Sequence, residues 1–340
     1  MATHKDWDKY TNGSEVANTF ADSVKGKNIV ITGVSPKSLG ETLATILASH
    51  SPASLILASR TESKLEAVAN AVREINPRCV VKIVVLDLSS QKSIRTAAAE
   101  ISNLVDHIDL LINNAAVMTP HHKRTAEGIE LQFGTGHIGH FLLTTELLPL
   151  LTKAAKSAPS GAVRVVNVTS QGHRLSPVRF HDYNFEGKDV PDEEKPPSWV
   201  PEHFQTKPGK TYSGFLAYGQ VKTANILFSL GLTERFEKEG VRSFAVHPGS
   251  IHTDLSRNLS PEDEAIIENT AGFWSSHDQG TSTILVAALD PALNTSSGGV
   301  FLSDCQVIDA MPHASDPKAA ERLWGLSEEL IDGKGANAFL

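Results

Sequence analysis

Tyr218 and Lys222 are the first pair of residues whose types and spacing indicate chemistry. They lie four positions apart near the start of a stretch of helical composition, 217–239, so their side chains share one face of the expected helix. A lysine ammonium beside a phenol favours the phenolate and brings the tyrosine pKa toward the range needed for proton transfer to or from an alcohol oxygen. The pair indicates an acid/base centre, although a tyrosine and a lysine at this spacing also occur by chance in many helices.

A glycine-containing loop, 33–40, has the features of a phosphate site. It follows an apolar run, 28–32, and leads into an expected helix over 41–49. Gly33 lets the backbone approach a pyrophosphate, the helix N-terminus supplies free N–H groups, and Gly40 permits close contact between helix and strand. An ordinary strand-to-helix turn is the alternative. The loop residues expected at the cofactor are Gly33, Ser35, Lys37, Ser38 and Leu39.

The ends of the next apolar runs bear on which nucleotide binds. Arg60 ends the second run, where an NAD-selective protein would present an acidic residue to the ribose hydroxyls. Arg60 and Lys37 together would give a 2′-phosphate charge-assisted hydrogen bonds, so the sequence predicts NADP(H). Further expected cofactor contacts close the third and fourth runs: Asp87, Leu88, Asn114 and Ala115. For Asp87 and Asn114 a satisfied turn is the alternative.

A parallel sheet is needed to bring these residues together. Apolar, β-rich runs alternate with helical patterns from residue 28 onward, which is typical of a single doubly wound α/β domain with helices on both faces of a mainly parallel sheet. The stretch 63–75, for example, has apolar side chains at helical spacing on one face and charged ones on the other. We expect seven strands, at 28–32, 54–59, 80–86, 109–112, 163–168, 243–246 and 300–302.

Two segments depart from this alternation. Residues 171–217 are polar and rich in proline, which prevents a long helix or a central strand, and we interpret this insertion as a lid or pocket wall. Residues 251–276 are either a flap on the substrate side or a surface helix with its aromatic side chains packed inward. The expected layout is one Rossmann-type domain over 1–340, with an N-terminal extension (1–25) and a C-terminal tail (305–340).

Composition and charge argue against several classes of partner. The chain has 340 residues and a formal net charge of −8, which gives no reason to expect nucleic acid or an anionic membrane. Residues 1–27 do not resemble a signal or transit peptide, and no apolar run approaches membrane-spanning length, so we expect a cytoplasmic protein. His121, His122, His137 and His140 lack carboxylate or cysteine partners at ligand spacing, so no metal site is expected.

Taken in order along the chain, the motifs resemble the short-chain dehydrogenase/reductase family over about 26–302. The sequence around Tyr218 and the stretch 139–144 are similar to the branch that contains retinol dehydrogenases and many fungal secondary-metabolism reductases. The resemblance implies a Rossmann-type sheet with the strand order 3-2-1-4-5-6-7. The matching pieces are Thr32-Gly33 with Gly40, Asn113-Asn114-Ala115, Val166-Asn167-Val168-Thr169-Ser170, Tyr218 to Lys222 and His247-Pro248-Gly249.

The resemblance also implies roles for single residues. Tyr218 would be the general acid/base, Lys222 would lower its pKa and hold the nicotinamide ribose, and Ser170 would hydrogen-bond the substrate oxygen. The family often dimerises through the helices corresponding to 128–151 and 217–239, which implies a homodimer unless the tail beyond Asp304 covers that surface. The residues implied at the nicotinamide end of the cofactor are Pro248, Gly249, Ile251 and Thr253.

Two positions depart from the family pattern. Ser38 stands where the phosphate loop normally has its middle glycine, and the loop carries one extra residue. Gly136 replaces the asparagine that holds the water of a proton relay behind the lysine. A glycine has no side chain to bind that water, and it weakens a helix by about 1 kcal/mol relative to alanine. The water would then rest on backbone groups, or His137 would substitute for the asparagine.

The sequence therefore predicts an NADP(H)-dependent oxidoreductase that reduces a ketone or aldehyde, or oxidises the matching alcohol, of a mostly apolar small molecule such as a secondary-metabolism intermediate. Gly136 supports an alternative, a non-redox isomerase, dehydratase or cyclase with NADP as a structural ligand. A catalytically lapsed nucleotide sensor is a second alternative, against which the retention of Ser170, Tyr218 and Lys222 argues. The candidate substrate-pocket residues are Met118, His173, Trp199, Phe204, Tyr212 and Trp274.

Overall fold

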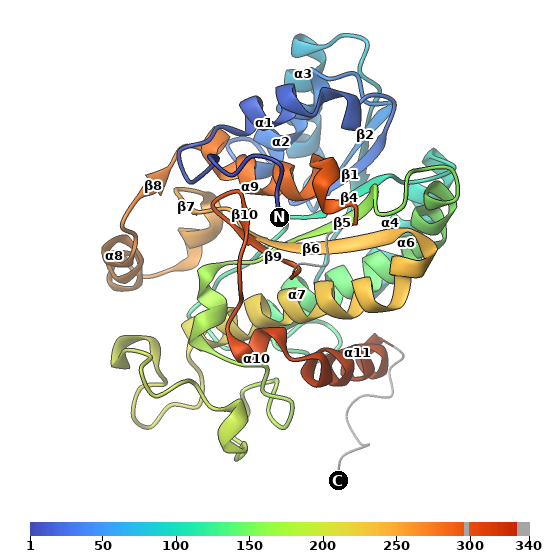
Figure 1. Cartoon of the computed structure of the whole chain (residues 1–340). Coiled ribbons are helices and arrows are strands. Elements are labelled where there is room, and N and C mark those ends of the chain that lie inside the picture. Colours follow the sequence, from blue (N-terminus) through green and yellow to red (C-terminus); the bar gives the residue numbers. More distant parts are fainter. Residues whose placement is uncertain (296–298, 332–340) are drawn as a thin grey trace.

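The centre of the fold is a mainly parallel sheet (Figure 1). Within the described residues of the computed structural model, 1–295 and 299–331, this sheet has eight strands in the order β10-β9-β6-β5-β4-β1-β2-β3. Without β10 the order is the expected 3-2-1-4-5-6-7. The strands are β1 Asn28–Thr32, β2 Ser54–Ser59, β3 Val81–Val85, β4 Leu110–Asn113, β5 Val163–Val168, β6 Val241–His247, β9 Phe301–Ser303 and β10 Gln306–Val307.

The expected sheet of seven strands was one strand short at its β9 edge. β10 pairs with β9 in the antiparallel sense over only two residues. The turn between them places Asp304 and Cys305 at φ angles of 50° and 62°. Two paired residues are too few to leave an alternating pattern in a sequence, which is why β10 was not predicted.

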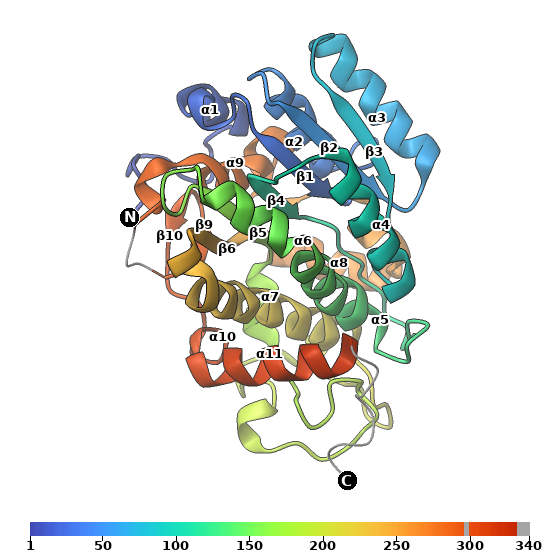
Figure 2. The same ribbon diagram turned by 90° about the vertical axis from the view of Figure 1, so that its right-hand side faces the viewer.

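Helices cover both faces of the sheet (Figure 2). Alternate residues of a strand serve opposite faces, since Ile29 and Ile31 lie in one core cluster and Val30 lies in the other. Burial on both sides explains why the strands read as continuous apolar runs. One face carries α2 Leu39–Ala48, α3 Glu62–Ile75 and α9 His277–Leu289, and the other carries α4 Gln91–Leu104, α6 Gly139–Ala155 and α7 Gly214–Phe236.

Both ends of the chain add to this core. The N-terminal helix α1, Gly13–Thr19, packs on α9, where the Ser14 hydroxyl donates to Asp278 Oδ2 over 2.7 Å. After β10 come α10, Pro312–Ser315, and α11, Pro317–Ile331, which lies along α7 in both views (Figures 1 and 2). The last part of the expected tail, 332–340, lies outside the described residues. No helix that the structure describes combines the length and the apolar character needed to cross a membrane.

The proline-rich insertion forms a lobe of loops beyond α7, drawn in yellow-green in Figure 1. Its regular structure consists of short 3-10 turns at Gln171–Leu175, Asp192–Glu194 and Glu202–Phe204. Glu194 is buried within it and accepts hydrogen bonds from His181 and from Arg322 of α11. The second irregular segment contains strands β7 Ser250–Ile251 and β8 Trp274–Ser275, which pair in parallel, and helix α8, Pro261–Thr270.

Candidate active site

The loop after β1 is shaped by close backbone approaches. Gly33 has φ of 75°, and a Cβ at this position would lie 2.6 Å from Cα of Ala115. A Cβ on Gly40 would lie 2.7 Å from the Gly33 oxygen, so neither position accepts a side chain without movement. Ser38, at the place of the family's middle glycine, caps α2: its hydroxyl oxygen accepts from Glu41 N–H over 3.3 Å and its hydroxyl donates to Ser35 O over 2.6 Å.

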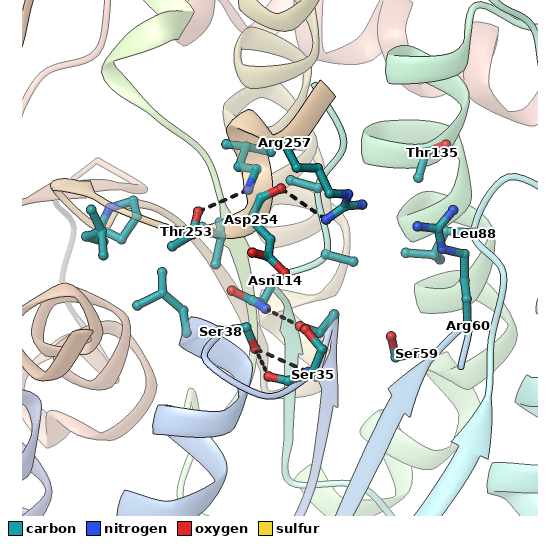
Figure 3. Close-up of a pocket in the computed structure, with 18 of the residues that line it drawn as sticks. Ser35, Ser38, Ser59, Arg60, Leu88, Asn114, Thr135, Thr253, Asp254 and Arg257 are labelled. Atoms are coloured by element: carbon teal, nitrogen blue, oxygen red, sulfur yellow. Dashed lines mark hydrogen bonds between the residues drawn. The ribbon is translucent and has the colours of Figure 1, made fainter. Parts of the chain in front are cut away.

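A cavity of about 340 Å³ opens beside this loop, at the carboxyl ends of the strands (Figure 3). Most of the residues expected at the cofactor line it, together with the three residues expected at the reaction centre. These are Gly33, Ser35, Ser38, Leu39, Arg60, Leu88, Asn114, Ala115, Pro248, Gly249, Ile251 and Thr253, with Ser170, Tyr218 and Lys222.

Lys37 and Asp87 are not among the residues that line this cavity. Lys37 has φ of 60°, and its main-chain N–H donates to the Glu41 carboxylate over 2.6 Å. Asp87 forms a satisfied turn, in which Oδ1 accepts from the N–H and the hydroxyl of Ser89 over 2.9 and 2.7 Å. The expected contact of Lys37 with a 2′-phosphate and of Asp87 with adenine therefore has no support in this geometry.

Other cations, which the sequence analysis did not single out, do line the cavity. Lys64 follows Arg60 by four residues, and Arg257 comes from the 3-10 turn Asp254–Asn258. Figure 3 shows Arg60 and Arg257 extending from opposite sides of the cavity. No ion pair joins Arg60, Lys64 or Arg257 to a carboxylate among the described residues, although Asp254 also lines the cavity. The four-residue spacing between Arg60 and Lys64 could have predicted that Lys64 lies near Arg60. The position of Arg257 at the cavity depends on the tertiary fold of the 251–276 segment, which the sequence does not indicate.

The hydroxyl of Thr135 gives an independent test of whether the cavity fits a dinucleotide. It lines the cavity, yet it is buried without a hydrogen-bond partner in the described part of the chain (Figure 3). A buried hydroxyl left unpaired costs about 1–3 kcal/mol, which a ligand hydroxyl or ring nitrogen would offset. This donor, the N-terminus of α2 and the unpaired cations fit the sugar and phosphate groups of a nicotinamide dinucleotide.

Helix α7 and strand β5 position the three residues expected at the reaction centre. Ser213 caps α7 by accepting from the N–H of Leu216 over 3.3 Å, so Tyr218 falls in the second turn and Lys222 in the third. The Lys222 ammonium lies 5.2 Å from the centre of the Tyr218 ring and donates to Val168 O over 2.9 Å. Ser170 follows β5, and its hydroxyl is hydrogen-bonded to Tyr218. The three functional groups thus converge at one wall of the cavity.

Burial dominates the protonation of this centre. It raises the pKa of Tyr218 to about 12, although the hydrogen bond from Ser170 lowers it in part. It lowers the pKa of Lys222 to about 8, because the charged form is poorly solvated. The net shift of the Tyr218 pKa is therefore upward, opposite to the expected direction, because burial outweighs the groups that favour the phenolate. At neutral pH Tyr218 is a phenol able to donate a proton, and Lys222 is mostly an ammonium.

His173 ties the serine turn to the C-terminal part of the chain. Its Nδ1–H donates to Ser170 O over 2.8 Å, and its Nε2 accepts from the N–H of Met311 over 3.3 Å. His313 donates to the His173 carbonyl over 2.9 Å. Burial lowers the pKa of His173 to about 4, so the neutral tautomer that makes both bonds is the stable one at neutral pH. His173, a candidate pocket residue in the sequence, is a positioning residue here.

Gly136 lies in a π-helical turn, Gly134–Ile138, between α5 Leu131–Phe133 and α6. A Cβ at Gly136 would lie 2.7 Å from Cγ1 of Val221, so Val221 occupies the space that a side chain at this position would need. The alternative in which His137 substitutes for the asparagine has no support in this geometry, since His137 Nε2 is hydrogen-bonded to the Ser327 hydroxyl of α11 over 2.8 Å and His137 does not line the cavity.

A second cavity, of about 880 Å³, shares Ser170 and Tyr218 with the first. The proline-rich insertion and the 251–276 segment both contribute residues to its wall. Tyr212, the remaining candidate pocket residue, lines a neighbouring cavity instead. The wall of the second cavity includes the large apolar side chains of Met118, Trp199, Phe204, Phe215 and Trp274.

Comparisons with known proteins agree with this geometry. A family model described as short chain dehydrogenase matches residues 27–184. Mouse retinol dehydrogenase 11 is 35% identical over 306 residues, which cover 90% of this chain and 86% of that protein. Oxidoreductase fscI of Fusarium equiseti is 35% identical over 246 residues, covering 72% and 94%. The crystal structure of an uncharacterised protein from Mycobacterium paratuberculosis aligns with a TM-score of 0.64 at 30% identity, covering 91% of this chain and 94% of that one.

Proposed function

Since the chain belongs to the short-chain dehydrogenase family of oxidoreductases, we propose that it is an NADP(H)-dependent reductase of a ketone or aldehyde carried by a mostly apolar small molecule, of the kind that secondary metabolism makes. We call the cavity of about 340 Å³ the dinucleotide cavity and the second cavity, of about 880 Å³, the apolar cavity. The observation that supports this proposal is that Ser170 and Tyr218 line both of them. A carbonyl bound on the apolar side would thus face both hydroxyls and the nicotinamide end of the other cavity.

The protein side of the reaction follows from the chemistry of these residues. When bound, the nicotinamide supplies the hydride that adds to the carbonyl carbon. The Ser170 hydroxyl donates a hydrogen bond to the carbonyl oxygen and stabilises the negative charge that develops there. Tyr218, protonated at neutral pH, donates its proton to that oxygen to give the alcohol. Lys222 holds its ammonium beside the phenol and stabilises the tyrosinate that remains.

The preference for NADP(H) rests on Arg60, Lys64 and Arg257. Their positive charges lack carboxylate partners among the described residues, and a 2′-phosphate supplies two negative charges that a ribose hydroxyl does not. From the sequence, Lys37 is the expected partner of Arg60 at the phosphate, and the geometry supports Lys64 and Arg257 in that role instead. We expect the phosphate to lie between the side chains of α3 and of the 254–258 turn.

The test of this function has a chemical arm and a cofactor arm. Purified protein should oxidise NADPH in the presence of some member of a panel of aromatic ketones and aldehydes. Tyr218→Phe should abolish this oxidation, whereas Tyr10→Phe, at an exposed tyrosine, should not.

Arg60→Ala should weaken NADPH binding about 10- to 100-fold and leave NADH binding within about twofold, because one charged hydrogen-bond partner is lost. Lys37→Ala is the matched control. Equal binding of NADPH and NADH by the native protein would contradict the preference.

Gly136 and Val221 favour a second candidate function. The asparagine of the family's proton relay is absent, and Val221 fills its space. A non-redox enzyme, such as an isomerase, dehydratase or cyclase with NADP as structural ligand, would need no such relay. Conversion of a substrate without any change in the absorbance of reduced nicotinamide would support this alternative over the reductase.

A further inference from the structure

We propose that the substrate carries an oxyanion, a carboxylate in the simplest case, at the end remote from its reacting carbonyl, and that a separate cationic cavity holds this group. The inference rests on the proposed reductase function and adds a substrate class to it. Because it predicts a binding preference, it can be tested apart from turnover.

The cationic cavity has a volume of about 590 Å³ and lies between three segments. One is the loop after β4, another is the end of the proline-rich insertion, and the third is the start of α8 with the residues before it. Five of the residues around it carry a basic side chain: His121, His122, His203, Lys207 and Lys210. Such a concentration of basic groups is informative in a chain whose net charge is −8.

The two lysines are not neutralised by their surroundings. In the part of the chain that the structure describes, no ion pair is found for Lys207 or Lys210, whereas two other lysines of the same insertion have partners. Lys188 pairs with Glu186 over 3.0 Å, and Lys195 pairs with Asp192 over 2.7 Å. Lys207 and Lys210 are exposed at the cavity wall, so both ammonium groups are available to an external anion.

Two acids near the cavity have hydrogen-bond partners of their own. Asp263 lines it, and its Oδ2 accepts from the Ser260 hydroxyl over 2.9 Å. Glu130 lies behind Tyr212, whose hydroxyl donates to Glu130 Oε1 over 3.0 Å. The N–H groups of Gln132 and Phe133 also donate to Glu130, over 3.0 and 2.8 Å. These bonds satisfy Glu130 without the cavity cations.

His122 is held in a fixed orientation at the wall. Its ring stacks on Tyr212 with centroids 4.9 Å apart and an interplanar angle of 22°. Its Nε2 is hydrogen-bonded to the main-chain oxygen of Asn184 over 2.8 Å. The carbonyl partner requires a hydrogen on Nε2, so the position and orientation of the imidazole at the cavity wall are fixed.

The cationic cavity continues the apolar substrate cavity. Met118 and Phe215 line both, and Tyr218 follows Phe215 by three residues in α7. At the rise of an α-helix, these two positions differ by about 4.5 Å along the axis. A molecule with its carbonyl at Tyr218 and an apolar body across Phe215 therefore reaches the basic side chains. An oxyanion there forms charge-assisted hydrogen bonds, while a neutral group of the same size does not.

The test uses a matched pair of probes, 4′-acetylbiphenyl-4-carboxylate and its methyl ester. Their binding to protein saturated with NADP⁺ is measured by quenching of tryptophan fluorescence, since Trp199 and Trp274 line the apolar cavity. We expect the carboxylate to bind about tenfold more tightly than the ester, from two partly exposed charge contacts. The Lys207→Ala/Lys210→Ala double variant should bind the two probes equally, and the Lys188→Ala/Lys195→Ala double variant should keep the native preference.

Two results would overturn the inference: equal affinity for the two probes in the native protein, or an undiminished preference in the Lys207→Ala/Lys210→Ala variant. The outcome is separable from that of the proposed function. If neutral ketones are reduced without any preference for the carboxylate, the cationic subsite is wrong and the reductase stands. If the carboxylate preference is present but no carbonyl compound oxidises NADPH, the reductase is wrong.

Discussion

Burial moves the pKa values of the two ionisable groups of the reaction centre in opposite directions, to about 12 for Tyr218 and about 8 for Lys222. Below pH 8 both groups are protonated, which is the form that donates a proton and stabilises the resulting tyrosinate. Above it Lys222 loses its charge while Tyr218 keeps its proton. In the proposed reduction, the alkaline limit would therefore be set by the lysine.

This difference predicts the pH dependence of turnover. The ratio kcat/KM for NADPH reports the free enzyme, and we expect it to fall above pH about 8 as Lys222 deprotonates. In Lys222→Arg, which stays charged, the alkaline limb should disappear even where the rate itself is lower. A native profile that stays level up to the ordinary lysine pKa would contradict the assignment.

The relative positions of single residues were predictable from the sequence where both residues lie on one helix, because their spacing decides which face they share. The four-residue interval places Tyr218 and Lys222 on one face whatever the rest of the chain does. Lys37 shows the limit, because its direction depends on a left-handed backbone conformation that no pattern in the sequence marks. Arg257 and Thr135 reach the cavity through tertiary folding of a turn and of a π-helical segment, so their types alone gave no signal.

The bounds of several strands were predictable from the sequence, whereas one helix is less regular than expected. Strands β1, β2 and β5 have the expected bounds, because burial on both faces leaves long apolar runs that end at turns. The stretch expected as a helix over 128–151 instead begins with a loop and passes through the π-helical turn Gly134–Ile138 before α6. A widened turn of this kind needs one extra residue per turn, and π-helical turns often occur at functional sites.

The π-helical turn gives a prediction about the pair Gly136 and Val221. Gly136→Asn alone should lower the free energy of unfolding by about 1–3 kcal/mol, because its Cβ meets Val221 Cγ1 and the site becomes overpacked. Adding Val221→Ala should recover most of that loss, since the clashing methyl groups are removed. Urea unfolding of the two single variants and the double variant forms a cycle that isolates the interaction.

Additive losses in that cycle would show that the two positions do not compete for space. The turnover of the double variant tests what the glycine does for catalysis. A rise above the native rate would indicate that the family's relay is weakened in this chain, and a loss of activity would indicate that the glycine makes room for a substrate.

At the scale of the whole molecule, α11 occupies the face of α7 through which a homodimer was expected. Leu323 and Leu330 of α11 lie in one apolar cluster with Val221 and Leu227 of α7. Trp324 stacks edge-on against Phe141 of α6, with centroids 5.0 Å apart. A partner helix has no access to this face while α11 is in place, so we expect a single chain in solution.

Sedimentation velocity tests that expectation, and a substitution tests the packing that causes it. Leu323→Ala should lower the free energy of unfolding by about 2–5 kcal/mol, because a buried leucine leaves a cavity between α11 and α7. The exposed Lys318→Ala should change it by about 0.5 kcal/mol or less. A native dimer, or a Leu323→Ala variant as stable as the Lys318→Ala control, would show that α11 does not cover this face in solution.

The bonds around His173 separate the support of the reaction centre from the support of the nucleotide site. The turn that holds Ser170 is fixed by Met311 and His313, which follow β10. The residues that line the dinucleotide cavity all lie between 33 and 257. Loosening of the segment that contains Met311 and His313 would therefore misalign the serine while the residues that contact the nucleotide stay in place, and the protein would hold a cofactor that it could not use.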